Sequence, residues 1–262
     1  MAGYFYPSDP SELRELISHL TRHDGVRTQA RGLIVPHGSF RHAGAIAGAA
    51  FGRIVIPRRC IAIGPSHTGS WMPWSLMTGG AYRTPLGDVP IDAACAAALQ
   101  ARCPFLEADA WSQRGEHAIE VPLPFLQHLG PKDLSIVPIV TGADRTEEFV
   151  QLAQALAQVV RMLEEPVLLI ASSDFSHYES QACVTEQDHA LLDAVQTMDG
   201  ASLVRLVQDE RPLMCGYGAV ACVLDASRQL GARRAGLVRY GTSADAGGDP
   251  HSAIGYASVI IE

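Results

Sequence analysis

Residues 167–177 read Val-Leu-Leu-Ile-Ala-Ser-Ser-Asp-Phe-Ser-His, an apolar run that ends in small polar residues and a histidine. Two earlier stretches end in the same way: residues 32–37 read Gly-Leu-Ile-Val-Pro-His, and residues 61–67 read Ile-Ala-Ile-Gly-Pro-Ser-His. Short apolar runs rich in β-branched residues are typical of buried strands in a mainly parallel sheet. The carboxyl ends of such strands face the ligand crevice. We therefore predict that the three histidines meet at one edge of the sheet.

Strand and helix patterns alternate outward from these runs, which predicts an α/β fold with a mainly parallel or mixed sheet flanked by helices. No repeat or linker divides the chain, so we expect residues 1–262 to form a single domain. Residues 72–90 are expected to form an extended excursion over the sheet, and residues 241–252 a flexible loop. The patterns predict strands at 31–36, 59–64, 134–140, 167–172, 235–241 and 253–261 and helices at 9–23, 43–54, 91–102, 146–163, 184–197, 199–208 and 216–230.

The composition excludes several classes of function. The formal net charge is −8 and there is no run of basic residues, which argues against a nucleic-acid partner. The sequence has neither a charged-then-apolar leader nor an apolar stretch long enough to cross a membrane, so we expect a soluble, cytoplasmic protein. The six cysteines form no C-x-x-C pair and are expected to be mostly buried thiols. Residues 216–221 match a dinucleotide fingerprint only superficially, because no strand pattern precedes them.

The histidines at the strand ends suggest a metal site. His37 follows a proline that ends its strand, and His67 follows Gly64-Pro-Ser. Imidazole pairs on rigid elements suit iron, copper or zinc. Asp174 is either a third ligand, as in two-histidine, one-carboxylate iron sites, or a residue that orients His177 as a general acid or base. Either histidine alone is more often a hydrogen-bonded structural residue, and Asp174 can also cap a turn.

Two further clusters contain groups that could take part in chemistry. Residues 116–120 read Glu-His-Ala-Ile-Glu, and Pro122 and Pro124 limit any helix here to its first turn or less, so a solvated loop is an equally good interpretation. Cys215 precedes Gly216 at the expected start of a helix. The helix dipole would lower the pKa of this thiol and favour a thiolate ligand or a redox group.

Taken in order, these motifs resemble the Memo family, also called AmmeMemoRadiSam system protein B, which is related to the B-type subunit of class III extradiol dioxygenases. The matching segments begin with Ala-Gly-Tyr-Phe-Tyr-Pro at residues 2–7 and continue through Tyr-Arg-Thr-Pro-Leu-Gly-Asp at 82–88 to Gly-Tyr-Ala-Ser at 255–258. Between them lie the histidine, Glu116, Ser172 and Cys215 motifs. The family usually has Tyr-x-Tyr-Ser-Gly after the first histidine, whereas residues 40–44 here read Phe-Arg-His-Ala-Gly, which places His42 near the pocket in place of an aromatic hydroxyl.

The resemblance implies a metal-capable pocket with His37, His67 and Cys215 as metal ligands. It implies a catalytic role for His177, whose counterpart in the dioxygenases acts as acid or base, beside Asp174; Glu116 and His117 are further candidates for catalysis. The expected metal is Fe(II) or Cu, with Zn possible. A thiolate in place of the carboxylate ligand of the dioxygenases favours Cu(I), Zn(II) or tightly held Fe over an open Fe(II) oxygenation site.

Three functions follow as hypotheses. The first is non-haem iron or copper redox chemistry related to that of dioxygenases. The second is a non-catalytic metal- or peptide-binding module, and the family's system name implies a radical-SAM partner under either hypothesis. A zinc hydrolase comes last, because no nucleophile or glutamate base lies at a diagnostic spacing. The small-molecule or peptide ligand is not specified by these residues.

Overall fold

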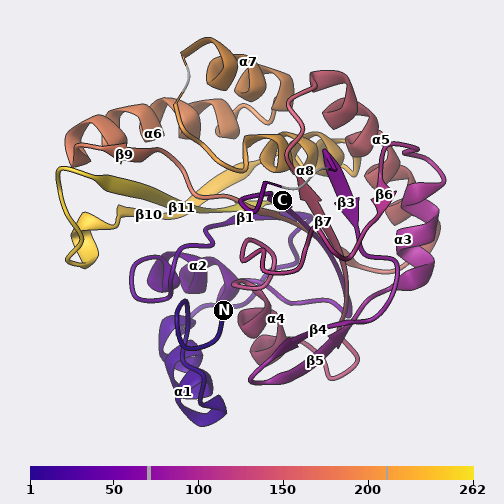
Figure 1. The fold of residues 1–262 in the computed structure, drawn as a ribbon, viewed down its shortest axis with the longest axis horizontal. Helices are drawn as coiled ribbons and strands as arrows, with labels where there is room; N and C mark the ends of the chain where they lie inside the picture. The colour runs from indigo at the N-terminus through magenta and orange to yellow at the C-terminus, as the bar shows by residue number, and fades with distance from the viewer. Residues whose placement is uncertain (70–71, 211) are drawn as a thin grey trace.

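A mixed β-sheet forms the centre of the molecule in a computed structural model that describes residues 1–69, 72–210 and 212–262 (Figure 1). Its four central strands are parallel and lie in the order β1, β8, β2, β7. The antiparallel strands β11 and β10 extend the sheet beside β1, and β3 and β6 extend it beside β7. The strands span β1 Gly32–Val35, β2 Arg59–Pro65, β3 Trp74–Leu76, β6 Glu107–Ala108, β7 Ser135–Thr141, β8 Val167–Ser172, β10 Ala235–Thr242 and β11 Ala253–Ile261.

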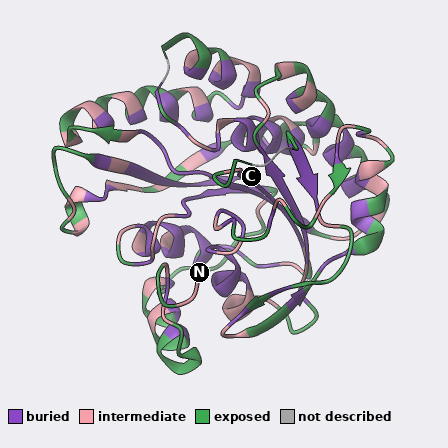
Figure 2. Ribbon diagram, viewed as in Figure 1, coloured by how far each residue is buried: buried purple, intermediate pink, exposed green. Residues whose placement is uncertain are grey.

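The central strands are buried because helices cover both faces of the sheet. Every residue of β1 and β8 is buried, as parallel sheets require. Successive side chains of a strand point to opposite faces, and Ile34 accordingly joins one core cluster while Leu33 joins the other. Figure 2 shows the buried strands running through the middle of the molecule, with exposed residues on the outer sides of the helices.

The two layers of helices differ in size (Figure 1). Apolar residues of α3, α5, α6, α7 and α8 belong to the larger cluster, and those of α1, α2 and α4 belong to the smaller one. The helices span α1 Pro10–Leu20, α2 Gly44–Phe51, α3 Ala93–Gln100, α4 Leu123–Leu129, α5 Thr146–Leu163, α6 Gln181–Gln196, α7 Gly200–Glu210 and α8 Tyr217–Gln229. The predicted α/β class, with a mixed sheet flanked by helices, is confirmed.

Most predicted elements are present, with differences of a few residues at their ends. The predicted helix 146–163 and strand 167–172 have the bounds of α5 and β8. The excursion at 72–90 contains β3 and a separate hairpin of β4 Ala81–Thr84 and β5 Gly87–Pro90. Helix α4 was not predicted, because Pro124 stands inside it; the proline lies in the first turn, where its missing N–H costs nothing.

The remaining differences concern short elements near the crevice. Strand β9 His177–Glu179 pairs with β11, and a 3-10 helix covers Ala244–Ala246 in the predicted loop. The element before α8 is the helix α7, whereas a dinucleotide fingerprint at residues 216–221 would need a strand there. Arg211, between α7 and α8, lies outside the described residues. In the described part of the chain, no helix has the length and apolar character needed to cross a membrane.

Candidate metal centre

Three imidazoles come together at the carboxyl end of the central strands. His37 follows β1 by two residues and His67 follows β2 by two, while β8 lies between these strands in the sheet. Their ring centroids are 5.1 Å apart. The third ring is His117, whose centroid lies 5.2 Å from His37 and 4.4 Å from His67. The expected meeting of His37 and His67 is confirmed, with His117 from a loop as their close neighbour.

Hydrogen bonds fix the tautomer of His37. The Ser172 hydroxyl lies 2.9 Å from Nδ1 of His37, and it donates its own proton to the carbonyl of Ala118 at 2.5 Å. The hydroxyl must therefore accept a proton from Nδ1, which leaves the lone pair on Nε2. Burial and the nearby His67 and His117 lower the pKa of His37 well below its ordinary value. His37 is therefore a neutral imidazole with Nε2 available as a ligand.

Glu116 fixes His67 in the same tautomer. A carboxylate can only accept, so its contact of 2.9 Å with Nδ1 of His67 places the proton on Nδ1 and the lone pair on Nε2. This arrangement of carboxylate, imidazole and free nitrogen is the one that supports metal-binding histidines. The side chain of His67 is 33% exposed, so its ring is reached from solvent.

The Glu116 carboxylate is saturated with donors. It accepts from the backbone N–H groups of His67, His117 and Ala118 at 2.5, 2.8 and 2.9 Å, besides the imidazole of His67. Burial by itself would raise the pKa of Glu116, but the hydrogen bonds to its charged form have the larger effect, and the pKa is lowered to about 2. Residues 118–120 form a turn, and Glu116 before it is 1% exposed, so the solvated-loop interpretation is wrong for this residue. Glu116 positions His67 rather than facing solvent.

Cys215 completes a group of three potential ligands. Its sulfur lies 3.4 Å from Nε2 of His37, and one ligand atom from each of His37, His67 and Cys215 lies within 4.8 Å of the others. His67, Glu116 and His117 form a second such group. In that group, however, the four donors already occupy the carboxylate, so binding a metal would require breaking one of its bonds.

The pKa of Cys215 shifts in the direction opposite to the one predicted from the sequence. Burial, together with the negative charge of Asp174, raises the pKa of Cys215, whereas the helix dipole was expected to lower it. The physical reason is that desolvation penalises the thiolate more than one helix end stabilises it. Gly216 allows the close approach of this turn to β8, because a Cβ there would lie 2.5 Å from the carbonyl oxygen of Ser172.

Asp174 and His177 lie near the centre but are not joined as expected. Oδ1 of Asp174 accepts from the backbone N–H groups of His37 and Gly38 at 2.8 and 3.2 Å, so the carboxylate fixes the turn after β1. Nδ1 of His177 donates to the carbonyl of Leu213 at 2.7 Å. Among the described residues, Leu213 and not Asp174 therefore orients His177. Burial raises the pKa of Asp174.

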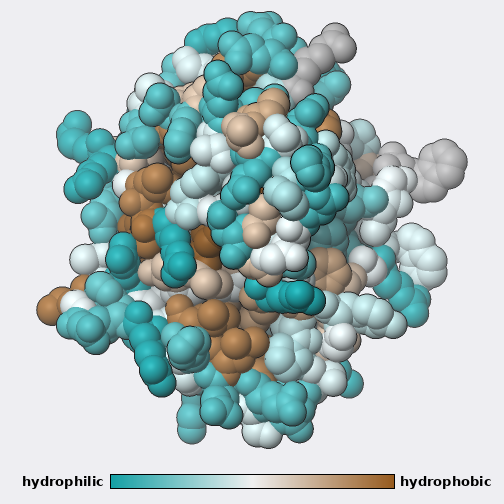
Figure 3. Space-filling model, turned by 90° about the vertical axis from the view of Figure 1, so that its left-hand side faces the viewer, coloured by the Kyte–Doolittle hydropathy of each residue, from teal (hydrophilic) through white to brown (hydrophobic). Residues whose placement is uncertain are grey.

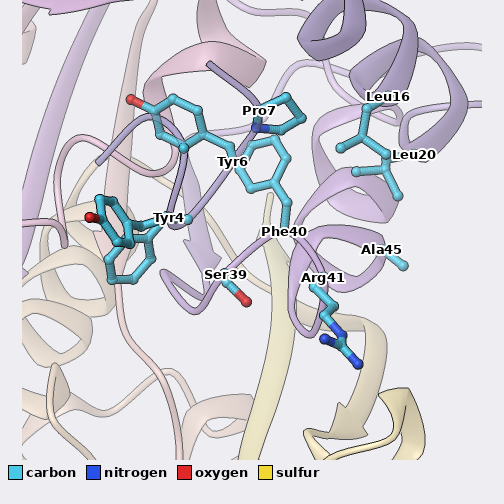
Figure 4. Close-up of a pocket in the computed structure, with 11 residues that line it drawn as sticks. Tyr4, Tyr6, Pro7, Leu16, Leu20, Ser39, Phe40, Arg41 and Ala45 are labelled. Atoms are coloured by element: carbon cyan, nitrogen blue, oxygen red, sulfur yellow. The ribbon is translucent and has the colours of Figure 1, made fainter. Parts of the chain in front are cut away.

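The aromatic N-terminal segment supports the cluster from one side. Phe5 stacks on His117 at 4.7 Å, and the hydroxyl of Tyr6 donates to Glu120 at 2.5 Å. Figure 4 shows Tyr6, Pro7 and Phe40 lining a pocket of about 490 Å³, with Leu16 and Leu20 of α1 on its other side.

His42 instead contacts the hydroxyl of Ser39 at 3.1 Å, and none of its ring contacts in the described chain reaches the three imidazoles.

Sequence reasoning missed three residues that shape this centre. Ser172 was considered only as a turn residue, Phe5 only as part of a family motif, and Leu213 not at all. Only the position of Ser172 at the end of β8, between the strands that precede His37 and His67, offered a signal. The contacts of Phe5 and Leu213 depend on loops that follow no periodic pattern.

Exposed apolar side chains occur beside several of these residues. Tyr4 precedes Phe5, Tyr178 follows His177, and Leu213 lies two residues before Cys215; they are 91%, 68% and 60% exposed. Trp111, which is 75% exposed, adjoins Ser112, whose carbonyl accepts from Thr68 next to His67.

Known proteins match this chain over nearly its whole length. A family model described as Memo-like protein matches residues 1–260. A MEMO1 family protein of Methanopyrus kandleri is 32% identical, and the match covers 100% of this chain and 97% of the relative. MEMO1 family proteins of Methanothermobacter thermautotrophicus and Nitrosopumilus maritimus are 34% and 32% identical, over 98% and 99% of this chain and 97% of each relative.

Proposed function

This chain belongs to the Memo-like family, and we propose that it is a metal-binding protein whose centre consists of His37, His67 and Cys215. One observation carries the proposal: two hydrogen-bond relays place the lone pairs of both histidines on Nε2, and the two side chains offer ligand atoms within 4.8 Å of one another and of the Cys215 sulfur. Nε2 of His37 already faces the Cys215 sulfur at 3.4 Å, and imidazoles whose other nitrogen is held by a hydrogen bond in this way are typical of metal-binding histidines.

The donor set favours copper or iron, and zinc also fits it. Two imidazoles with one sulfur are softer than the carboxylate-containing sets of Fe(II) oxygenases. Because burial raises the pKa of Cys215, the thiol must lose its proton when a metal binds. When bound, copper or iron would supply one-electron redox chemistry at this edge of the sheet.

The neighbouring side chains would move protons. The carbonyl of Leu213 holds the proton of His177 on Nδ1, so the lone pair on Nε2 is available as a general base. Burial raises the pKa of Asp174 above its ordinary value, so this carboxyl is the second group beside the same turn that we propose for proton exchange. We propose dioxygenase-related redox chemistry in which His177 and Asp174 exchange protons with a bound substrate.

A second candidate is a metal- or peptide-binding module without turnover. The exposed Tyr4, Trp111, Tyr178 and Leu213 favour it, because such side chains suit an extended or macromolecular ligand. A radical-SAM protein is the partner that the family's system name proposes for either function.

Elemental analysis tests the metal centre directly. The chain is purified without a metal-binding tag, alongside Cys215→Ala and the control Cys183→Ala, whose cysteine lies in α6 outside the candidate ligand group. We expect about one copper or iron per chain in the wild type and in Cys183→Ala, and a loss of most of it in Cys215→Ala. Metal-free protein in all three, also after incubation with Cu(I) or Fe(II), would contradict the proposal.

Oxygen uptake distinguishes the two candidates. The iron-loaded protein is offered a panel of catechols, and the wild type is compared with His177→Ala. Uptake that disappears in His177→Ala supports redox catalysis. Bound metal without uptake across the panel supports the binding module.

A further inference from the structure

A basic hollow of about 300 Å³ lies between α1, α2 and β10. It is lined by His19, Arg22, His23, Arg53 and Arg239, and its other lining residues are apolar. No carboxylate lines it, although the formal net charge of the chain is −8. Its lining shares no residue with the candidate metal centre, so the two features are separate.

The hollow is assembled from three distant parts of the chain. Arg22 comes just after α1, Arg53 just after α2, and Arg239 lies in β10. Figure 1 shows α2 between α1 and β10, which brings these arginines to one surface. The space-filling view of this side shows hydrophilic side chains around the hydrophobic patches (Figure 3). The cluster is therefore tertiary and leaves no basic run in the sequence.

A β-bulge directs Arg239 toward the hollow. The pairing of β10 with β11 shifts between Leu237 and Arg239. In a regular strand Val238 and Arg239 would face opposite sides, yet both line the hollow. Bulges of this kind re-aim side chains near binding sites.

In the described chain some arginines have side-chain partners, whereas those of the hollow, like Arg31 and Arg41 elsewhere, have none of their own. Arg58, Arg59 and Arg145 form ion pairs, and Arg102 and Arg161 donate to backbone carbonyls. Across residues 1–69, 72–210 and 212–262, neither a carboxylate nor a carbonyl accepts from the guanidinium groups of Arg22, Arg53 and Arg239. Each guanidinium offers five N–H donors in a fork that matches a phosphate. An anion would satisfy these donors and offset their mutual repulsion.

We propose that this hollow binds a small phosphorylated molecule, with a phosphate or diphosphate group held by Arg22, Arg53 and Arg239. A second hollow of about 240 Å³ shares His23, Arg53 and Val238 with the first, so the groove has room for an organic part beside the anion. The charges converge on one cavity rather than forming a stripe, which favours a small anion over a nucleic acid.

Titration calorimetry with inorganic pyrophosphate tests this site on the full chain. The double variant R53Q/R239Q is compared with R41Q, which changes an exposed arginine outside the hollow. We expect R53Q/R239Q to weaken binding roughly tenfold or more, because two charge-assisted contacts are lost. R41Q is expected to stay within about twofold. Raising the salt from about 20 to about 200 mM should weaken wild-type binding roughly threefold or more, because it shortens the screening length.

The remaining outcomes decide between this site and the alternatives. His37→Ala is expected to bind pyrophosphate like the wild type, so that loss of binding there would assign the anion to the metal centre and overturn the proposal. Equal losses in R41Q and R53Q/R239Q would also overturn it. The proposal is also overturned if the wild-type protein binds no pyrophosphate at millimolar concentration, even if it binds phosphatidylserine vesicles or DNA. If R53Q/R239Q unfolds at the same temperature as the wild type, the two exposed substitutions have left the fold intact.

Discussion

Replacing Glu116 by glutamine should weaken both the fold and the metal centre. Oε1 accepts from Nδ1 of His67 and from the backbone of His117 and Ala118, and Oε2 accepts from the backbone of His67. If the amide oxygen of the variant takes the place of Oε1, its NH2 group faces the N–H of His67. Two donors then oppose each other in a buried position, and three charge-assisted bonds become neutral ones.

The magnitude follows from two separate estimates. A buried donor without an acceptor, together with the weaker remaining bonds, costs about 3 kcal/mol. The pKa of Glu116 is lowered to about 2 from an ordinary value of 4.5, which corresponds to at most about 3 kcal/mol of interaction with the ionised form. In a protein of this size such a loss lowers the Tm by roughly 6–12 °C.

The sign of the pH dependence is fixed by the direction of this shift. The folded-state pKa of Glu116 lies below the unfolded value, so the carboxylate contributes its full stability above about pH 4.5. This contribution is lost as the pH falls from about 4.5 toward 2. The difference in unfolding free energy between wild type and Glu116→Gln should therefore shrink on acidification.

Urea unfolding and metal titration measure the two effects. With His67 no longer oriented, metal affinity should fall roughly 10- to 100-fold, as for other residues that support metal ligands. Glu120→Gln is the matched control, because Glu120 lies in the same loop but bonds Tyr6 and the N-terminus. Unchanged stability and metal affinity in Glu116→Gln, or an equal loss of affinity in Glu120→Gln, would refute the role given to Glu116.

Three other substitutions test neighbouring contacts. Ser172→Ala leaves Nδ1 of His37 and the carbonyl of Ala118 unpaired, so we expect a loss of about 2–4 kcal/mol in urea unfolding and roughly tenfold weaker metal binding; wild-type values for both would disprove the relay. Gly216→Ala places a Cβ 2.5 Å from the backbone of β8, and calorimetry should show a loss of about 3 kcal/mol; a stable variant would show that the turn can move. Burial raises the pKa of the Asp188 carboxyl, so the wild type should lose stability relative to Asp188→Asn as the pH rises from about 4 through this raised pKa. A difference in unfolding free energy that does not change with pH would contradict that account.

The sequence determined the sheet and the elements that position the site. The apolar runs before His37, His67 and Asp174 specify β1, β2 and β8, because a strand buried on both faces needs continuous apolar residues. Parallel strands end at the same edge, so the approach of His37 to His67 also followed from the sequence. The main failure in secondary structure was α4, where proline was taken as a barrier although it occupies the first turn.

The chemical state of the site was decided only by tertiary structure. A helix dipole is a local property, but burial depends on every neighbour, and the surroundings of Cys215 reverse the predicted direction of its pKa shift. The bond from His177 to Leu213 and the stacking of Phe5 on His117 likewise join residues whose separation in sequence carries no pattern. The basic hollow shows the same limit, since Arg22, Arg53 and Arg239 become neighbours only when α1, α2 and β10 pack. Sequence periodicity specifies which faces are buried and hence where the strands end, whereas hydrogen bonds and electric fields depend on distances that exist only in the folded chain.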